Sequence, residues 1–203
     1  MRIRVPALAA TALAAALSIP SAPAAAVIGQ PAPEVSLPDT SGATQRLSAF
    51  KGRFVVLEWV NFECPFVGKH YGSGNMQKLQ KAYTQKGVVW LSICSSAQGK
   101  QGYVTGQEAN TLVEAKGAAP TRFLLDPKGS AGKAYGAKTT PHMFVIDPKG
   151  TLIYNGAIDD KPSTNKDDVP TAKNYVAAAL DESMAGEKVA MSATQPYGCS
   201  VKY

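Results

Sequence analysis

The fold is predicted most directly by residues 54–65, which read FVVLEWVNFECP. The first seven are mostly β-branched, aromatic or aliphatic, which is typical of a central β-strand. From Pro65 to about Lys86 apolar residues recur at helical spacing, with the Gly-Ser-Gly run at 72–74 as a weak point. A cysteine between a strand and a helix faces unpaired backbone amides at the positive end of the helix dipole, which favours its thiolate. Cys64 is therefore the candidate nucleophile, and Pro65 suits the first helical position. The alternative is a buried, inert thiol.

Glu58 interrupts this otherwise apolar strand. Alternation along the strand places it on the same face as Val56 and Val60, which favours burial. A buried carboxyl group is costly unless it is paired or its pKa is raised. Glu58 is therefore a candidate proton donor or acceptor for Cys64. The alternative is that it faces solvent or pairs with a lysine.

The rest of the chain alternates apolar runs with helical patterns, which predicts an α/β fold in which helices cover a sheet. The segment Asp147-Pro148-Lys149-Gly150 has the composition of a type I turn and predicts a hairpin. Polar residues 159–170 are expected to form a surface loop, followed by a C-terminal helix and tail over about 171–203. The other expected strands are 88–93, 123–125, 142–146 and 151–154, and the other expected helices are 108–115 and 129–135.

The first residues have the order of a secretory signal peptide. Arg2 and Arg4 precede an alanine-rich apolar run at 7–19, then a proline-bearing break and three alanines that end at Ala26. Cleavage is expected after Ala26, which divides the chain into a signal peptide at 1–26 and one domain at 27–203. The alternative is a retained membrane anchor, but the run is short for a span. Export places the domain in an oxidising compartment, such as the periplasm, or outside the cell.

The composition of the chain excludes a disordered polymer, a collagen, a coiled coil and a multi-pass membrane protein. The chain has 203 residues, of which 45% are hydrophobic, and a formal charge of +6. This is an ordinary balance for a globular domain. The basic residues are scattered, which disfavours a nucleic-acid-binding surface. Three cysteines are too few for a disulfide-built scaffold, and the odd number requires an explanation.

The ordered motifs resemble those of the thioredoxin-fold redoxins. They are IGQPAP at 28–33, the central strand, Cys64, and the pair Thr140-Pro141. Within that fold the chain is similar to the alkyl hydroperoxide reductase and thiol-specific antioxidant group, which is peroxiredoxin-like, over roughly residues 28–160. The resemblance implies a three-layer α/β fold with a central mixed sheet, no cofactor, and a cis proline at Pro141 facing Cys64. It also implies that the Thr140 backbone can bind a peptide as a strand, and that Glu58 matches a buried acid of thioredoxins.

The chain departs from both groups within this resemblance. Val67 stands where thioredoxins carry their second cysteine, and Asn61 stands where peroxiredoxins carry a hydroxyl residue. Pro141-His142 stands where a catalytic arginine is expected. These departures favour thiol exchange over peroxide reduction. The expected substrate-binding residues are Asn61, which could donate in place of the hydroxyl, Pro65, Thr140, Pro141, and His142 at the rim of the site.

A second cysteine must resolve Cys64 if it turns over. Cys199 lies on a C-terminal tail that can fold back, and Gly198 gives the backbone freedom. Cys94 follows a strand expected to end at the same sheet edge as Cys64. We favour Cys199, because redoxin-like relatives carry a similar Y-G-C segment, but Cys94 stays open. The bond could instead be a permanent structural bridge. His70 is expected to be a surface histidine.

These observations favour an exported thiol–disulfide oxidoreductase of peroxiredoxin-like type. An external dithiol, or a protein thiol or disulfide, would be its partner, and a peroxide remains open as substrate. The alternative is a copper-delivery protein on the same fold, with Cys64, Cys94, His142 and Met143 as soft or imidazole ligands. Gly68 stands where such proteins need a second cysteine. A third reading is a binding module whose cysteines are locked together.

Overall fold

The computed structural model describes Met1 and residues 26–203, so the predicted signal peptide lies almost wholly outside the described residues. A five-stranded mixed sheet forms the centre of the domain, in the order β5-β4-β3-β7-β8. Strand β3 pairs in parallel with β4 and antiparallel with β7. The strands are β3 (Val55–Trp59), β4 (Val89–Cys94), β5 (Arg122–Leu125), β7 (His142–Ile146) and β8 (Leu152–Gly156). No helix in the described part is both long and apolar enough to cross a membrane.

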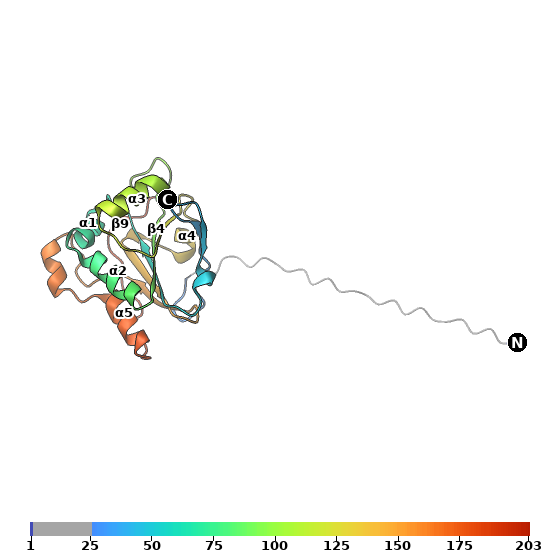
Figure 1. Cartoon of the computed structure of the whole chain (residues 1–203). Coiled ribbons are helices and arrows are strands. Elements are labelled where there is room, and N and C mark those ends of the chain that lie inside the picture. Colours follow the sequence, from blue (N-terminus) through green and yellow to red (C-terminus); the bar gives the residue numbers. More distant parts are fainter. Residues whose placement is uncertain (2–25) are drawn as a thin grey trace.

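Helices cover both faces of the sheet and make a three-layer α/β domain, as expected (Figure 1). Alternation along β3 sends Val56 to the face covered by α1, α2, α3 and α5, and Leu57 to the face covered by α4 and the N-terminal segment. Both side chains are fully buried, and each such burial stabilises the fold by roughly 1.5–3 kcal/mol. The helices are α1 (Pro65–Gly72), α2 (Asn75–Gln85), α3 (Gly106–Ala115), α4 (Ser130–Tyr135) and α5 (Tyr175–Met184).

The helix expected over 65–86 is two helices. Gly74 adopts a left-handed conformation with φ of 76°, which ends the path of α1 and starts α2 in a new direction. The weak point seen in the sequence is therefore a real break. Helix α5 starts later than expected, because residues 166–171 form the short 3-10 helix η2 with Pro170 inside it. Asn174 then caps α5 by accepting from the Ala177 amide.

Short strands complete the fold around the sheet. The hairpin at Asp147–Gly150 joins β7 to β8 as predicted, with the Gly150 amide donating to the Asp147 carbonyl at 2.9 Å. The N-terminal segment forms a small ribbon and one turn of 3-10 helix. These elements are β1 (Ser36–Pro38), β2 (Thr44–Arg46) and η1 (Leu47–Phe50). A second two-stranded antiparallel sheet is formed by β6 (Thr139–Thr140) and β9 (Cys199–Ser200).

The C-terminal tail, residues 186–203, folds back onto the domain, as expected from the sequence, and is docked there. Strand β9 pairs antiparallel with β6, and the Val201 amide donates to the Lys138 carbonyl at 3.0 Å. Beyond it, the Tyr203 hydroxyl donates to the Ala137 carbonyl at 2.8 Å. The tail is therefore held by backbone pairing on the edge that precedes Pro141.

Candidate functional site

Cys64 lies at the point where the chain leaves the sheet and enters α1. It is the N-cap residue of that helix, Pro65 follows at the first helical position, and the Gly68 amide donates to the Cys64 carbonyl at 2.8 Å. Pro65 itself is exposed, whereas Cys64 is only 1% exposed. The placement predicted for Cys64 and Pro65 is confirmed, and the nucleophile candidate is shielded from solvent.

Cys199 lies directly against Cys64. The two Sγ atoms are 2.7 Å apart, although 135 positions separate the residues along the chain. Both sulfurs are free thiols in this structure, as is Cys94. Cys199 is half-buried, so it is the more accessible of the two paired sulfurs. The tail thus presents a second thiol to Cys64 without any rearrangement.

The two paired thiols have opposite pKa shifts. Burial alone would raise the pKa of Cys64, but hydrogen bonds from the Cys199 thiol and the Val67 and Cys199 backbone outweigh it and lower this pKa. The Thr140 side chain acts in the same direction. Burial, and then the hydrogen bond to Cys64, raise the pKa of Cys199 to about 11. Cys64 is therefore the more acidic thiol of the pair and Cys199 the less acidic one.

Cys94 occupies a different environment. It is the last residue of β4, it is buried, and its thiol donates to the Gly102 carbonyl at 3.2 Å. Burial raises its pKa. Of the two cysteines that remained open as partners, Cys199 is the one in contact with Cys64.

Thr140 and Pro141 form the wall opposite Cys64. The bond between them is cis, as the resemblance implied, and the Cys64 thiol lies 3.0 Å from the Thr140 carbonyl oxygen. Thr140 pairs with Cys199 in the β6–β9 ladder. The strand edge expected to bind a substrate peptide is therefore occupied by the protein's own tail.

Gly198 allows a closer approach of the tail than the sequence indicated. A Cβ at this position would overlap the Thr140 carbonyl oxygen, so only glycine lets the tail approach this closely. Its φ of 142° also lies in the region that favours glycine. The residue uses the backbone freedom of glycine to let the tail pack closely.

Glu58 is fully buried on β3, as predicted, and it accepts four hydrogen bonds. Tyr71 donates to Oε1 at 2.8 Å, and three donors share Oε2: Gln80 at 3.1 Å, Trp90 at 2.8 Å and Ser92 at 2.8 Å. Burial raises the pKa of Glu58, and these donors partly offset the rise. None of the four donors is a cysteine, so a proton passing between Glu58 and Cys64 would need an intermediary.

Asn61 and His142, both expected to bind substrate, are buried in this structure. Asn61 Oδ1 accepts from the Glu63 amide at 2.9 Å, and its Nδ2 lies 3.4 Å from the Gln101 carbonyl. The imidazole of His142 is 2% exposed; Nδ1 accepts from the Lys138 amide at 3.2 Å and Nε2 lies 2.8 Å from Asn155 Oδ1. This corrects the expectation that His142 lines an open rim, because β7 turns its ring into the core.

His70 was expected on the surface, and that prediction is wrong. Its side chain is fully buried, with Lys69 beside it on α1. Both contact Asp159, after β8, and Tyr197 on the tail. Helical spacing offered no signal for this cluster, because its partners come from two other parts of the chain.

The arrangement does not favour the copper alternative. Among the described residues no group of three or more His, Cys, Asp and Glu side chains is placed to hold a metal ion. Both ring nitrogens of His142 are hydrogen-bonded, and Met143 is fully buried in the core. Of the ligands named from the sequence, His142 and Cys94 are thus engaged in hydrogen bonds and Met143 in core packing.

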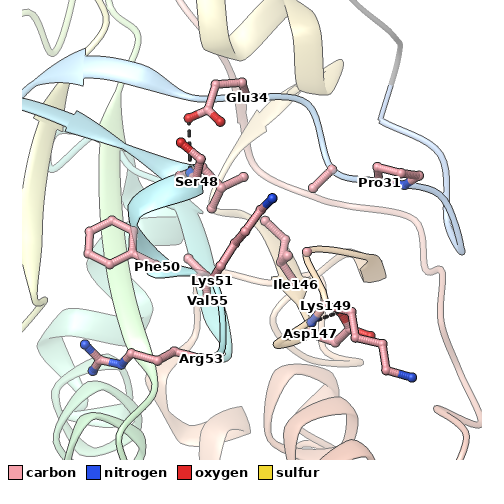
Figure 2. A pocket seen from close by; sticks show the side chains of 13 residues that line it. Pro31, Glu34, Ser48, Phe50, Lys51, Arg53, Val55, Ile146, Asp147 and Lys149 are labelled. Atoms are coloured by element: carbon pink, nitrogen blue, oxygen red, sulfur yellow. Dashed lines mark hydrogen bonds between the residues drawn. The ribbon is translucent and has the colours of Figure 1, made fainter.

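A pocket of about 370 Å³ lies at the opposite end of β3 from Cys64, beside Val55 and Ile146 (Figure 2). Lys51, Arg53 and Lys149 contribute to its lining. Its acidic groups are engaged by backbone amides, as when Asp147 accepts from the Lys149 amide at 2.9 Å (Figure 2). The pocket contains no cysteine and is separate from the sulfur site.

Comparison with known proteins agrees with this architecture. The sequence model described as Redoxin matches residues 28–176, whereas no match is found among curated proteins. A hypothetical protein from Sinorhizobium meliloti is 25% identical with a TM-score of 0.73, covering 87% of this chain and 94% of its own. An uncharacterized conserved protein from Geobacillus kaustophilus is also 25% identical, with a TM-score of 0.74 and coverage of 92% and 98%.

A third solved structure is a proposed thiol:disulfide interchange protein, DsbE, from Chlorobium tepidum. It is 25% identical with a TM-score of 0.50, and the match covers 64% of this chain and 84% of that one. The order of strands, the cysteine at the start of α1 and the cis proline opposite it all fit a thioredoxin-like fold. With a match that spans most of its length, the chain belongs to the redoxin family.

Proposed function

We propose that this protein is an exported thiol–disulfide oxidoreductase that uses Cys64 as nucleophile and Cys199 as its resolving thiol. The observation that carries the proposal is the 2.7 Å approach of the two sulfurs, with the lowered pKa on Cys64. A thiolate at a helix N-terminus is the reactive form in disulfide exchange. The likeness to a proposed interchange protein from Chlorobium tepidum supports the same chemistry.

The reaction transfers two electrons from the cysteine pair to a disulfide. The Cys64 thiolate attacks one sulfur of the substrate, which forms a mixed disulfide and releases the first substrate thiolate. Cys199 then loses its proton and attacks the Cys64 sulfur, which forms the Cys64–Cys199 bond and releases the second thiolate. With a peroxide, the first product would be a sulfenic acid on Cys64 and an alcohol or water, and the second step would release water.

An external dithiol closes the cycle, and the geometry favours its attack on Cys199. Cys199 is half-buried whereas Cys64 is 1% exposed. Attack at Cys199 also expels Cys64, the sulfur with the lowered pKa, and a thiol of lower pKa leaves faster. The reductant thus forms a bond to Cys199 and frees the Cys64 thiolate; its second thiol then releases Cys199.

Export is proposed from the leader pattern at residues 1–26, which carries two arginines, an apolar run and a small-residue site. An exported protein meets oxidising conditions, in which a cysteine pair can cycle. The fate of the leader can be read from the N-terminal sequence of protein purified from its native cells; an N-terminus at residue 1 would contradict the proposal.

The proposed chemistry is tested on the chain from residue 27 with a disulfide peptide and, separately, hydrogen peroxide. Cys64→Ser should lose at least about 100-fold in rate and keep its fold, because no other thiolate is placed for the attack. Cys199→Ser should stop at a mixed disulfide on Cys64, which mass spectrometry detects. Cys94→Ser is the matched control and should keep its rate within about twofold. Activity retained by Cys64→Ser would refute the assignment.

A permanent bridge is the competing account of the same pair. A bond across 135 positions would stabilise the fold by about 5 kcal/mol on the chain-entropy model. Titration in glutathione buffers separates the two accounts: a catalytic pair is reduced and reoxidised without loss of structure, whereas a structural bridge resists reduction until the protein unfolds.

A further inference from the structure

A buried polar cluster lies beside the tail, and the sulfur chemistry proposed above makes no use of it. It consists of Lys69 and His70 on α1, Asp159 after β8, and Tyr197 on the tail, and is called the tail cluster below. Lys69 Nζ lies 3.2 Å from Asp159 Oδ2, and the two side chains are 0% and 1% exposed. The Tyr197 hydroxyl donates to Asp159 Oδ1 and lies 3.4 Å from Lys69 Nζ. The cluster therefore ties the tail to the helix that begins at Cys64.

The protons of the cluster form one directed chain. The Asn75 amide donates to His70 Nδ1 at 2.9 Å, so the ring proton lies on Nε2, 3.3 Å from the Tyr197 oxygen. Burial lowers the pKa of His70 to about 4, which keeps the ring neutral near pH 7. Burial, and then the hydrogen bond to Asp159, raise the pKa of Tyr197, so its hydroxyl stays protonated. His70 thus donates to Tyr197, which donates to Asp159.

The buried Lys69–Asp159 ion pair is not expected to add much net stability, because the cost of removing two charges from water offsets their attraction. Replacement of buried ion pairs by apolar residues is often neutral or stabilising, so their presence is better explained by the geometry they impose. Here the geometry joins three segments: Lys69 Nζ also donates to the Lys161 carbonyl at 2.6 Å. Tyr197 and Cys199, two positions apart, pack against the same face of the core as Cys64.

We propose that Lys69, Asp159 and Tyr197 are positioning residues that hold Cys199 against Cys64. The proposal rests on the proposed function, since it gives these residues a part in the same exchange. The tail is anchored on both sides of Cys199, by Tyr197 before it and by the Val201 and Tyr203 bonds after it. The upstream anchor reaches α1, so it sets where Cys199 stands relative to Cys64. Release of Tyr197 exposes Cys64 and the Thr140 edge to a thiol or disulfide partner.

The test is Tyr197→Phe, which keeps the ring beside Phe66 and removes only the hydroxyl. Two quantities are measured: the equilibrium between the Cys64–Cys199 disulfide and glutathione, and the alkylation rate of Cys64 in the reduced protein. The effective concentration of the pair should fall by about tenfold or more, as expected for loss of a charge-assisted hydrogen bond. The alkylation rate of Cys64 should rise by a similar factor.

Tyr135→Phe is the matched control, because its hydroxyl also makes a hydrogen bond inside the protein, to the Pro33 carbonyl of the N-terminal segment rather than to the tail cluster. Both variants should lose thermal stability, but the control should leave both thiol measurements within about twofold of wild type. If Tyr197→Phe behaves like Tyr135→Phe, the positioning role is overturned. If the wild type itself forms no Cys64–Cys199 disulfide, the proposed function fails, and the alkylation rate alone still decides whether the cluster holds the tail.

Discussion

Gly198 passes directly against the carbonyl of Thr140, at a separation that leaves no room for a side chain at position 198. This contact brings the tail backbone onto the edge next to Pro141 and places the following residue, Cys199, over Cys64. The approach of two sulfurs that are 135 positions apart along the chain thus depends on one residue without a Cβ.

Replacement of Gly198 by alanine should lift the tail from this edge. The added Cβ would overlap the Thr140 carbonyl, and the positive φ would add strain. We expect Cys64 alkylation to accelerate by about tenfold or more, because the docked tail shields this thiol. Formation of the Cys64–Cys199 bond should slow, because it requires the docked tail. Gly68→Ala is the control, since a Cβ there meets nothing within 4 Å and the helix gains about 1 kcal/mol. Equal alkylation rates in the two variants would contradict the docking account.

The ionisation of Cys64 should depend on its partner. Hydrogen bonding lowers its pKa below the ordinary value of 9.0, whereas the pKa of Cys199 is raised to about 11. In a Cys94→Ser background, thiolate absorbance should therefore rise in two separate steps with pH, the first below 9.0. Cys199→Ala should move the first step upward and Cys199→Ser should move it less, because serine keeps a donor. A single step near the ordinary thiol value would count against the pairing.

Glu58 should destabilise the fold as it ionises. Burial raises the pKa of its carboxyl, so its contribution is present below the unfolded value of 4.5 and is lost as pH rises through the folded value. Glu58→Gln removes this titration, and its amide can still meet the Tyr71 hydroxyl. The free energy of unfolding of wild type relative to Glu58→Gln should therefore decline as pH rises above 4.5, as measured by urea denaturation.

Glu58→Ala serves as the contrasting variant. It removes the acceptor of the Tyr71, Trp90 and Ser92 donors, and we expect a loss of about 3–5 kcal/mol in the free energy of unfolding. Its thiol-exchange rate should also fall. A pH–rate profile that is unchanged in Glu58→Gln would assign Glu58 to stability alone.

His142 should make the fold sensitive to acid. Burial lowers its pKa to about 4 from an ordinary 6.5, so its stabilising contribution is complete above 6.5 and is lost as pH falls toward 4. The shift corresponds to at most about 3 kcal/mol at low pH. His142→Gln should show a shallower decline in denaturant midpoint over this window than wild type. Parallel declines would show that the ring titrates normally in the folded state.

Local sequence pattern predicted most of the sheet and the place of the nucleophile. Strand β3 and the start of α1 follow from a β-branched run and a Cys-Pro pair, whose preferences act over a few residues. The burial of Glu58 followed from alternation in the same way. The resemblance to redoxins, carried by short motifs, supplied the cis bond at Pro141.

Only the tertiary structure decided which sulfur meets Cys64 and how the tail is held. The β6–β9 pair joins Thr140 to Cys199, and the tail cluster joins Lys69 to Tyr197. Backbone pairing between short, distant segments produces no periodic pattern in the sequence. A charged residue that is buried against a distant partner also cannot be distinguished, from the sequence alone, from one exposed to solvent. For this reason His70 was expected on the surface, and the close contact of Gly198 with Thr140 was not foreseen: both are set by neighbours that approach only when the chain is folded.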